Sequence, residues 1–233
     1  MYSVDELEDR LIDLAFAEDI GDGDHTTLCC IPEEAMGKSH LLIKEDGILA
    51  GVEVAKRVFA RFDPTMKVEV LMGDGTPVKK GDIAMVVTGK VRSLLQTERL
   101  MLNIMQRMSG IATMTNRYVK RLEGTKTHVL DTRKTTPGMR MLEKQAVKIG
   151  GGMNHRIGLF DMILLKDNHV DFAGGIKNAI TRCHEYLKEK NLDLKIELEV
   201  RNFDELNQAL EQGGINRVML DNFSVEDTAK AVK

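Results

Sequence analysis

The sequence predicts an α/β protein in which an N-terminal α+β, sandwich-like domain precedes a (β/α) barrel domain. Short segments in which apolar and polar residues alternate, separated by glycine turns, fill most of the first 90 residues. A stretch of good helix formers follows them. After Gly124, strands and helices alternate at the spacing typical of parallel βαβ units. We expect the first domain, including the long helix, over residues 1–112 and the barrel domain over 113–233.

The first domain should begin with an amphipathic helix over residues 5–17, where apolar residues recur at helical spacing. Strands are predicted at 39–44 and 67–72. The turns in residues 73–89 resemble those of biotinyl- or lipoyl-type carrier domains, but no lysine stands between two hairpin strands. We therefore predict a simple hairpin with a Gly-Asp turn and solvated lysines in this segment.

Residues 93–124 predict one long helix, interrupted by a bend at Ser109-Gly110. Its methionines are expected to fill the core.

Four strand-then-helix units are predicted after Gly124. Strands are expected at 127–132, 161–169, 196–200 and 217–223, and helices at 139–149, 176–190, 204–212 and from Ser224 onward. Polar residues stand in or after every strand, namely Asp131, Arg133, Lys134, Lys166, Asp167, Asn168, His169, Glu197, Glu199, Asp221 and Asn222. A barrel builds its site from the C-terminal ends of successive strands, whereas a doubly wound sheet concentrates it at one switch point. The spread over four strands favours the barrel.

Composition excludes several classes of protein. A formal net charge of -3 and 4% aromatic residues argue against a nucleic-acid binder, and no apolar run is long enough to cross a bilayer. The acidic N-terminal segment is unlike a signal peptide. The three cysteines lack both metal-ligand spacing and a disulfide framework. We expect a cytoplasmic protein with no membrane or nucleic-acid partner.

Cationic side chains are concentrated between residues 133 and 169. They are Arg133, Lys134, Arg140, His155, Arg156, Lys166 and His169. At one barrel mouth these charges would repel one another without an anionic ligand, and several arginines indicate more than one carboxylate. Salt bridges on the surface are the alternative explanation for any one of them.

Two carboxylates, and a proline and three glycines, accompany these cations. Glu199 and Asp221, near the ends of neighbouring strands, could hold Mg²⁺ against a pyrophosphate, since magnesium takes one or two carboxylates plus phosphate oxygens. They could instead pair with lysines, and Glu197 points to the same face of its strand as Glu199. We expect Pro137 at a helix start and the glycines 150–152 in a flexible turn whose amides could approach a ligand.

The chain resembles the quinolinate phosphoribosyltransferases, also called carboxylating nicotinate-nucleotide pyrophosphorylases. The segments that carry the resemblance are AEDIGDGDHTT, KEDGILAGVEVA, TERLMLNIMQRMSGIAT, DTRKTTPGMRMLEKQAV, GGGMNHRIGLFDMILLKDNH, ELEV and MLDNFS. The resemblance implies that quinolinate and phosphoribosyl pyrophosphate are converted to nicotinate mononucleotide, pyrophosphate and carbon dioxide with Mg²⁺.

The resemblance also implies roles for individual residues. The quinolinate pocket would be lined by Arg133, His155, Arg156 and Lys166, with Lys134 nearby, while Glu199 and Asp221 would serve the ribose and the metal. Lys134, Lys166, Glu199 and Asp221 are the expected catalytic residues. Arg99 would reach the site of a neighbouring subunit, which implies a homodimer.

One departure from the family pattern concerns the end of the chain. The family continues past the LDNF segment with a Ser-Gly-Gly turn and a further strand, so the barrel is expected to be C-terminally incomplete at Lys233. Two rivals remain: the relative associated with molybdenum transport, and an inactive, truncated barrel that only binds a phosphorylated ligand.

Overall fold

The computed structural model describes residues 2–233, which divide into two compact units, residues 1–155 and 156–233. Each unit is described by itself. The predicted boundary at 112/113 falls inside a helix of the first unit and stays a prediction.

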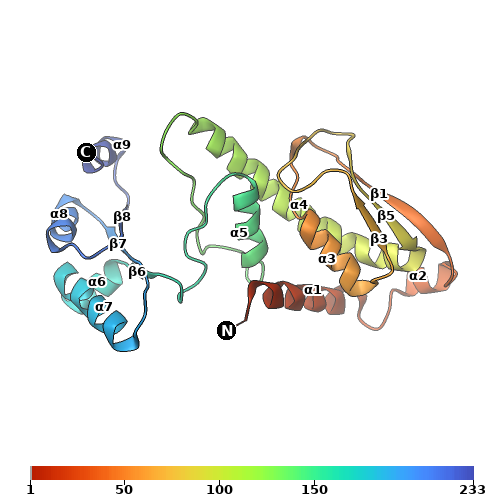
Figure 1. The fold of residues 1–233 in the computed structure, drawn as a ribbon, viewed down its shortest axis with the longest axis horizontal. Coiled ribbons are helices and arrows are strands. Elements are labelled where there is room, and N and C mark those ends of the chain that lie inside the picture. The colour runs from red at the N-terminus through yellow and green to blue at the C-terminus, as the bar shows by residue number, and fades with distance from the viewer. Residues whose placement is uncertain (1) are drawn as a thin grey trace. The chain divides into compact units, whose positions relative to one another are not determined.

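The first unit is built on an antiparallel sheet with a long helix against it (Figure 1). The strand order is β1 (Met36–Leu42), β5 (Ile83–Lys90), β3 (Lys67–Val70). Helices α3 (Val52–Phe62) and α4 (Val91–Arg121) pack together beside the sheet. Their buried faces join Met85 and Val87 of β5 in one core, because each helix places apolar residues three and four apart. This is the α+β domain that the sequence predicts.

Helix α4 supports the rest of the unit. Helices α1 (Val4–Ile20), α2 (His25–Cys30) and α5 (Arg140–Ile149) all contact it. It is continuous through Ser109-Gly110, so the predicted interruption is wrong. The Ser109 hydroxyl accepts a hydrogen bond from Ala50 N at 2.9 Å and donates to Ala50 O at 3.1 Å. The small Ser109 side chain therefore allows the chain at Ala50 to lie close to the helix. Met101, Met105 and Met108 fill the core as predicted, whereas Met114 is exposed.

The predicted hairpin in residues 73–89 does not form. Strand β4 (Pro77–Val78) pairs with β2 (Gly47–Ile48), whereas β5 pairs with β1 and β3. The alternation in the sequence reports a strand but not its partner, and here the partners come from distant segments.

The second unit contains a parallel sheet in the order β6 (Ile163–Leu165), β7 (Ile196–Val200), β8 (Arg217–Leu220). Helices α7 (Ile176–Lys190), α8 (Phe203–Gln212) and α9 (Val225–Ala231) lie at the predicted positions. The apolar face of the sheet is buried at Ile196, Leu198 and Val200. The predicted alternation of parallel strands and helices is confirmed, although the three strands do not close into a barrel within residues 156–233.

Four predicted strands are shorter than expected, and those at 67–72 and 217–223 end at Val70 and Leu220. Residues 127–132 make only one parallel bridge, Leu130 to Met153. The 161–169 strand ends at Leu165, because Asp167–Ala173 forms α6, a helix that sequence analysis missed. Among residues 2–233, no helix combines the length and the apolar character needed to cross a bilayer.

Candidate active site

The loop after Leu130, in the first unit, carries two of the predicted cations. The Nε atom of Arg133 is buried and has no hydrogen-bond partner among the described residues. Lys134 is exposed, and its backbone amide donates to Thr132 Oγ1 at 3.0 Å. A buried guanidinium nitrogen without an acceptor is costly. This position therefore suits an anionic ligand that supplies the missing acceptor.

A tight turn closes the loop. Met139 N donates to Thr136 O at 3.0 Å, and Gly138 has a φ of 81°. Pro137 and Gly138 occupy the second and third positions, where a type II turn favours Pro and requires φ > 0. Pro137 thus belongs to the turn, and the prediction that it lies at the helix start is wrong, because α5 begins at Arg140.

Arg107 on α4 links the loop to helices α4 and α5 through hydrogen bonds. Its Nη2 donates to Thr136 Oγ1 at 3.0 Å and to Glu143 Oε1 at 2.7 Å, and Glu143 Oε2 accepts from Thr136 N at 3.2 Å. Burial of Glu143 opposes its ionisation, but the hydrogen bonds from Arg107 and Thr136 outweigh burial and hold its pKa below the ordinary value. Sequence analysis missed Arg107 and Glu143, since they lie far apart in the chain and form no local motif.

Arg140, one of the clustered cations, is directed at the same loop. Its Nε donates to Thr135 Oγ1 at 3.1 Å and its Nη2 to Arg133 O at 3.5 Å. It therefore orders the main chain that carries Arg133.

A buried ion pair links this loop to His155. Lys144 Nζ on α5 bonds to Asp131 Oδ1 and donates to His155 O at 3.1 Å. Asp131 Oδ1 also accepts from His155 N at 2.9 Å, and Asn154, with its amide turned to satisfy both groups, donates to Asp131 Oδ2 at 2.8 Å. The half-buried His155 is thus held beside the loop of Arg133, as the cationic cluster predicted. Lys144 was not anticipated.

The three glycines at 150–152 do not form a flexible, ligand-facing turn. Their amides donate to Ala146 O, Lys148 O and Val147 O at 2.9 to 3.0 Å. A Cβ on Gly150 would lie 2.4 Å from Ala112 O, and one on Gly152 would lie 2.9 Å from the Thr115 side chain. Gly150 and Gly152 are therefore needed for close packing, Gly151 has a φ of 92°, and the suggestion that the amides of the three glycines could meet a ligand is wrong.

Arg99 is exposed on α4. It stands eight residues before Arg107, which corresponds to about 12 Å along a helix axis. No partner chain is present, so its predicted place in a neighbouring subunit's site stays a prediction.

The second unit brings Lys166 and Glu199 together. Lys166 Nζ lies 3.8 Å from Glu199 Oε2. Pairing of Glu199 with a lysine is one of the two arrangements that the sequence left open. Glu197 is 1% exposed and accepts from Arg217 Nη1 at 3.1 Å. Glu197 is therefore part of an internal pair, and Glu199 is the carboxylate of this strand that remains partly accessible.

Asp221 follows β8 at the same end of the sheet. Its amide donates to Val200 O at 2.9 Å, and its Oδ2 accepts from Asn222 Nδ2 at 2.9 Å. Asn222 has a φ of 55°, a conformation that asparagine tolerates better than most residues. The carboxylates of Glu199 and Asp221 thus stand at the ends of adjacent parallel strands.

The other two cations of the second unit have local partners. Arg156 Nη1 donates to Met162 O at 3.2 Å. His169 Nδ1 accepts from Lys166 N at 3.0 Å in the first turn of α6, so the histidine caps this helix.

The acidic pair of the second unit fits magnesium only in part. Two carboxylates at neighbouring strand ends suit Mg²⁺ that takes its other ligands from phosphate and water. Within residues 2–233, no group of three or more His, Cys, Asp or Glu side chains could hold a metal ion. Glu199 and Asp221 would therefore hold the ion only together with a substrate.

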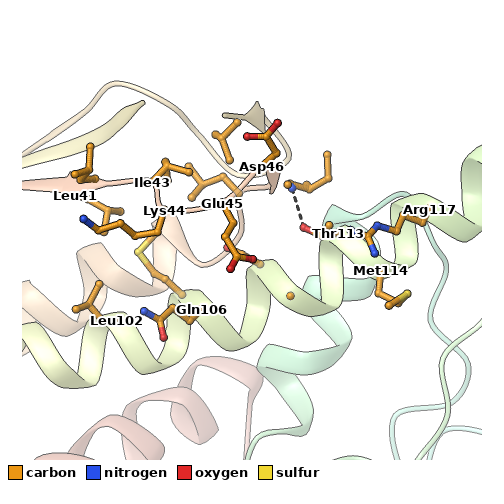
Figure 2. A pocket seen from close by; sticks show the side chains of 18 residues that line it. Leu41, Ile43, Lys44, Glu45, Asp46, Leu102, Gln106, Thr113, Met114 and Arg117 are labelled. Atoms are coloured by element: carbon orange, nitrogen blue, oxygen red, sulfur yellow. Dashed lines mark hydrogen bonds between the residues drawn. The ribbon is translucent and has the colours of Figure 1, made fainter. Parts of the chain in front are cut away.

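A separate pocket of about 590 Å³ lies in the first unit between residues 41–49 and α4 (Figure 2). Figure 2 shows Glu45 directed toward the helix, and Thr113 Oγ1 accepting from Ile48 N at 2.8 Å. None of the predicted site residues lines this pocket. Its size suits a ligand, but its lining is mostly aliphatic and its charges are of both signs.

Comparison with known proteins agrees with these observations. The family model for the N-terminal domain of quinolinate phosphoribosyl transferase matches residues 24–109, and that for the C-terminal domain matches residues 111–233. A chloroplastic nicotinate-nucleotide pyrophosphorylase [carboxylating] of Arabidopsis thaliana is 46% identical over 221 residues, covering 92% of this chain and 63% of the relative. A probable enzyme of the same name from Synechocystis is 41% identical over 217 residues, covering 93% and 72%.

Solved structures give the same result. The NadC protein of Streptococcus pyogenes has a TM-score of 0.91 and 38% identity, and the nicotinate-nucleotide pyrophosphorylase of Francisella tularensis has 0.90 and 41%. Each match covers 100% of this chain and 80% of the other. The chain spans 63% of the length of the first plant relatives. By two family models and by curated relatives over nine-tenths of its length, this chain belongs to the quinolinate phosphoribosyltransferase family.

Proposed function

We propose that this chain catalyses transfer of a phosphoribosyl group to quinolinate, with release of pyrophosphate and carbon dioxide, in the synthesis of NAD. The observation that carries the proposal is the buried Nε of Arg133, which has no hydrogen-bond partner among the described residues. The ion pairs of Arg107 with Glu143 and of Lys144 with Asp131 hold the cationic loop that contains Arg133 in place. The names of the relatives support the same reaction.

The first chemical step joins the two substrates. The lone pair of the pyridine nitrogen attacks the anomeric carbon of phosphoribosyl pyrophosphate, the bond from that carbon to the pyrophosphate oxygen breaks, and the electron pair leaves with pyrophosphate. Arg133, His155 and Arg156 bind the two carboxylates, since guanidinium groups meet carboxylates through paired hydrogen bonds. Lys134 and Lys166 stabilise the negative charge of the leaving group.

The second step releases carbon dioxide. The bond between the ring and the carboxylate beside the nitrogen breaks, and its electron pair stays on the ring carbon, where the newly cationic nitrogen stabilises it. A proton from water then completes nicotinate mononucleotide. This step needs orientation and electrostatics rather than a nucleophile or a general base.

Glu199 and Asp221 serve the ribose side. When bound with them and the substrate's phosphates, Mg²⁺ would neutralise charge on the leaving pyrophosphate. Glu199 also keeps Lys166 close to the strand end, since their charged atoms lie 3.8 Å apart.

We also propose a cytoplasmic homodimer in which Arg99 serves the partner's site. Leu95, Met114 and Tyr118 are exposed on α4 with Arg99, so this helix offers an uncovered face. The free cysteines suit a reducing compartment. Sedimentation of the chain tests the dimer, and restored activity in a mixture of Arg99→Ala and Arg133→Ala chains tests the shared site.

The reaction is tested with quinolinate, phosphoribosyl pyrophosphate and Mg²⁺. We expect nicotinate mononucleotide, pyrophosphate and carbon dioxide in equal amounts. Arg133→Ala should cost about 1.5 to 3 kcal/mol of quinolinate binding, or roughly 10- to 150-fold in affinity. Arg121→Ala, at the exposed end of α4, is the matched control and should change nothing.

The outcomes separate the rivals. Binding of both substrates without product would favour the inactive binding module, and molybdate or tungstate binding without quinolinate binding would favour the transport-associated relative. A loss in Arg133→Ala confined to the ribose substrate would contradict the role of Arg133.

A further inference from the structure

We propose that Asp131 and Lys144 form a buried positioning pair that fixes the separation between Arg133 and His155, and so makes the site selective for a dicarboxylate over a monocarboxylate. The inference rests on the proposed function for the identity of the ligand. Neither residue is assigned a contact with the substrate.

Burial of the pair is the first argument. The side chains of Lys144 and Asp131 are 3% and 7% exposed. Burying two charged groups costs more free energy than burying two apolar side chains of equal size. A buried ion pair is therefore poor evidence for stability, and a requirement for one specific geometry explains it better.

The bonds made by the pair define that geometry. Besides each other, the two charged groups bond to both main-chain groups of one residue: Lys144 Nζ donates to His155 O and Asp131 Oδ1 accepts from His155 N. Asp131 N in turn donates to Met153 O at 3.2 Å. One ammonium group on α5 therefore ties the segment that precedes Arg133 to the segment that ends at His155.

The balance of charge is the second argument. The Asp131 carboxylate is neutralised within the pair, as the Glu143 carboxylate is by Arg107. The acidic groups behind the loop therefore do not compensate Arg133 and Lys134 in front of it. The loop therefore presents the positive charges of Arg133 and Lys134 to a ligand. The pair makes the loop rigid without neutralising either of these charges.

The experiment uses Lys144→Met and a matched control, Lys148→Met, which makes the same change one turn later at an exposed position of α5. Binding of quinolinate, nicotinate and phosphoribosyl pyrophosphate is measured by calorimetry, and folding by thermal unfolding. We expect roughly a 10- to 150-fold loss of quinolinate affinity, which corresponds to the loss of one charge-assisted contact. Binding of nicotinate, which needs only one of the two groups, should fall far less, and the ribose substrate should bind as before.

A second variant covers the case in which Lys144→Met leaves Asp131 as an unpaired buried charge and the chain does not fold. Asp131→Asn/Lys144→Met removes both charges and should recover the unfolding midpoint. It still lacks the donor to His155 O, so quinolinate binding should stay weak. Wild-type affinity for quinolinate in a folded variant of either kind, or an equal loss for all three ligands, would overturn the proposal.

A measurement without ligand keeps this inference separate from the reaction. In the wild-type chain, the amide proton of His155 should exchange with solvent only through unfolding of the unit, because it is bonded to a buried carboxylate. Fast exchange of this proton would refute the positioning pair even in an active enzyme. Conversely, slow exchange in a chain that binds neither substrate would refute the proposed function and leave the pair intact.

Discussion

Adding one methyl group at Gly150 should destabilise the protein, although the smaller backbone freedom of alanine in the unfolded chain alone predicts the reverse. Gly150 follows α5 with a φ of -73°, a conformation that alanine adopts freely. Its Cβ would lie 2.4 Å from Ala112 O, 2.8 Å from Thr115 Cβ and 3.0 Å from Ala112 Cα. These atoms belong to the backbone of α4 or to a Cβ, and neither can rotate away. Overpacking of this kind costs about 1 to 3 kcal/mol.

Gly110→Ala is the matched control. Gly110 is exposed in the same helix that Gly150 contacts, and a Cβ there meets nothing within 4 Å. Alanine is about 1 kcal/mol better than glycine inside a helix, so this variant should be stabilised. Because the two substitutions are chemically identical, only the local space distinguishes them.

The assay is thermal unfolding followed by far-ultraviolet circular dichroism, repeated in urea. For a chain of this size about 2 to 4 °C corresponds to 1 kcal/mol. Gly150→Ala should therefore melt about 2 to 12 °C lower and Gly110→Ala about 2 to 4 °C higher than the wild type. An equal or higher melting temperature for Gly150→Ala would refute the reasoning that glycine is required here by contact with α4.

Three further predictions concern single hydrogen-bonded groups. Glu143→Gln should lose about 1 to 3 kcal/mol at neutral pH. Since the folded-state pKa of Glu143 is lowered, chiefly by Arg107 acting against burial, its contribution is present above the ordinary carboxyl pKa of about 4.3 and is lost as pH falls through the folded-state pKa. Urea midpoints measured from pH 7 to pH 3 should thus converge for the two proteins, and a constant difference would contradict the assignment. Thr113→Val should cost about 1 to 3 kcal/mol in urea unfolding, because the buried Ile48 N loses its acceptor; an unchanged midpoint would show that water replaces the hydroxyl. Asn202→Ala should cost about 1 kcal/mol and speed amide exchange in the first turn of α8 without affecting α4, and exchange that changes in both helices would argue against a local cap.

Local sequence patterns predicted helices α1, α4, α5, α7, α8 and α9, but missed α2, α3 and α6. Helix α7 was placed correctly at both ends, because its apolar residues recur at helical spacing within one short segment. In the structure it is bounded by Gly175 and by Asn191 in the αL conformation. The parallel strand β7 was found because apolar and charged residues alternate in IELEV, and β8 because a short apolar run follows Arg217, although this strand ends at Leu220 and not at the predicted residue 223.

The site residues stay a prediction, and the residues that hold their segments in place were not predicted. Arg133 and His155 could be named because cations clustered in loops are unusual, and the structure ties their segments together within the first unit. Arg107, Glu143 and Lys144 could not be named, because a charged residue in an amphipathic helix is most often solvated. Their roles follow from their contacts with Thr136 and Asp131, which lie in the loop after Leu130.

The sequence alone determined the long helix, the alternation of parallel strands and helices in the second unit, the family and the positive charge of the 133–169 region, because each of these depends on neighbouring residues or on composition. Only the tertiary structure decided that β4 pairs with β2, that Glu197 is internal while Glu199 faces Lys166, and that Gly150 serves packing rather than ligand binding. Strand partners, buried ion pairs and glycine contacts join residues that are distant in the chain, and their energies depend on burial, which no local pattern specifies.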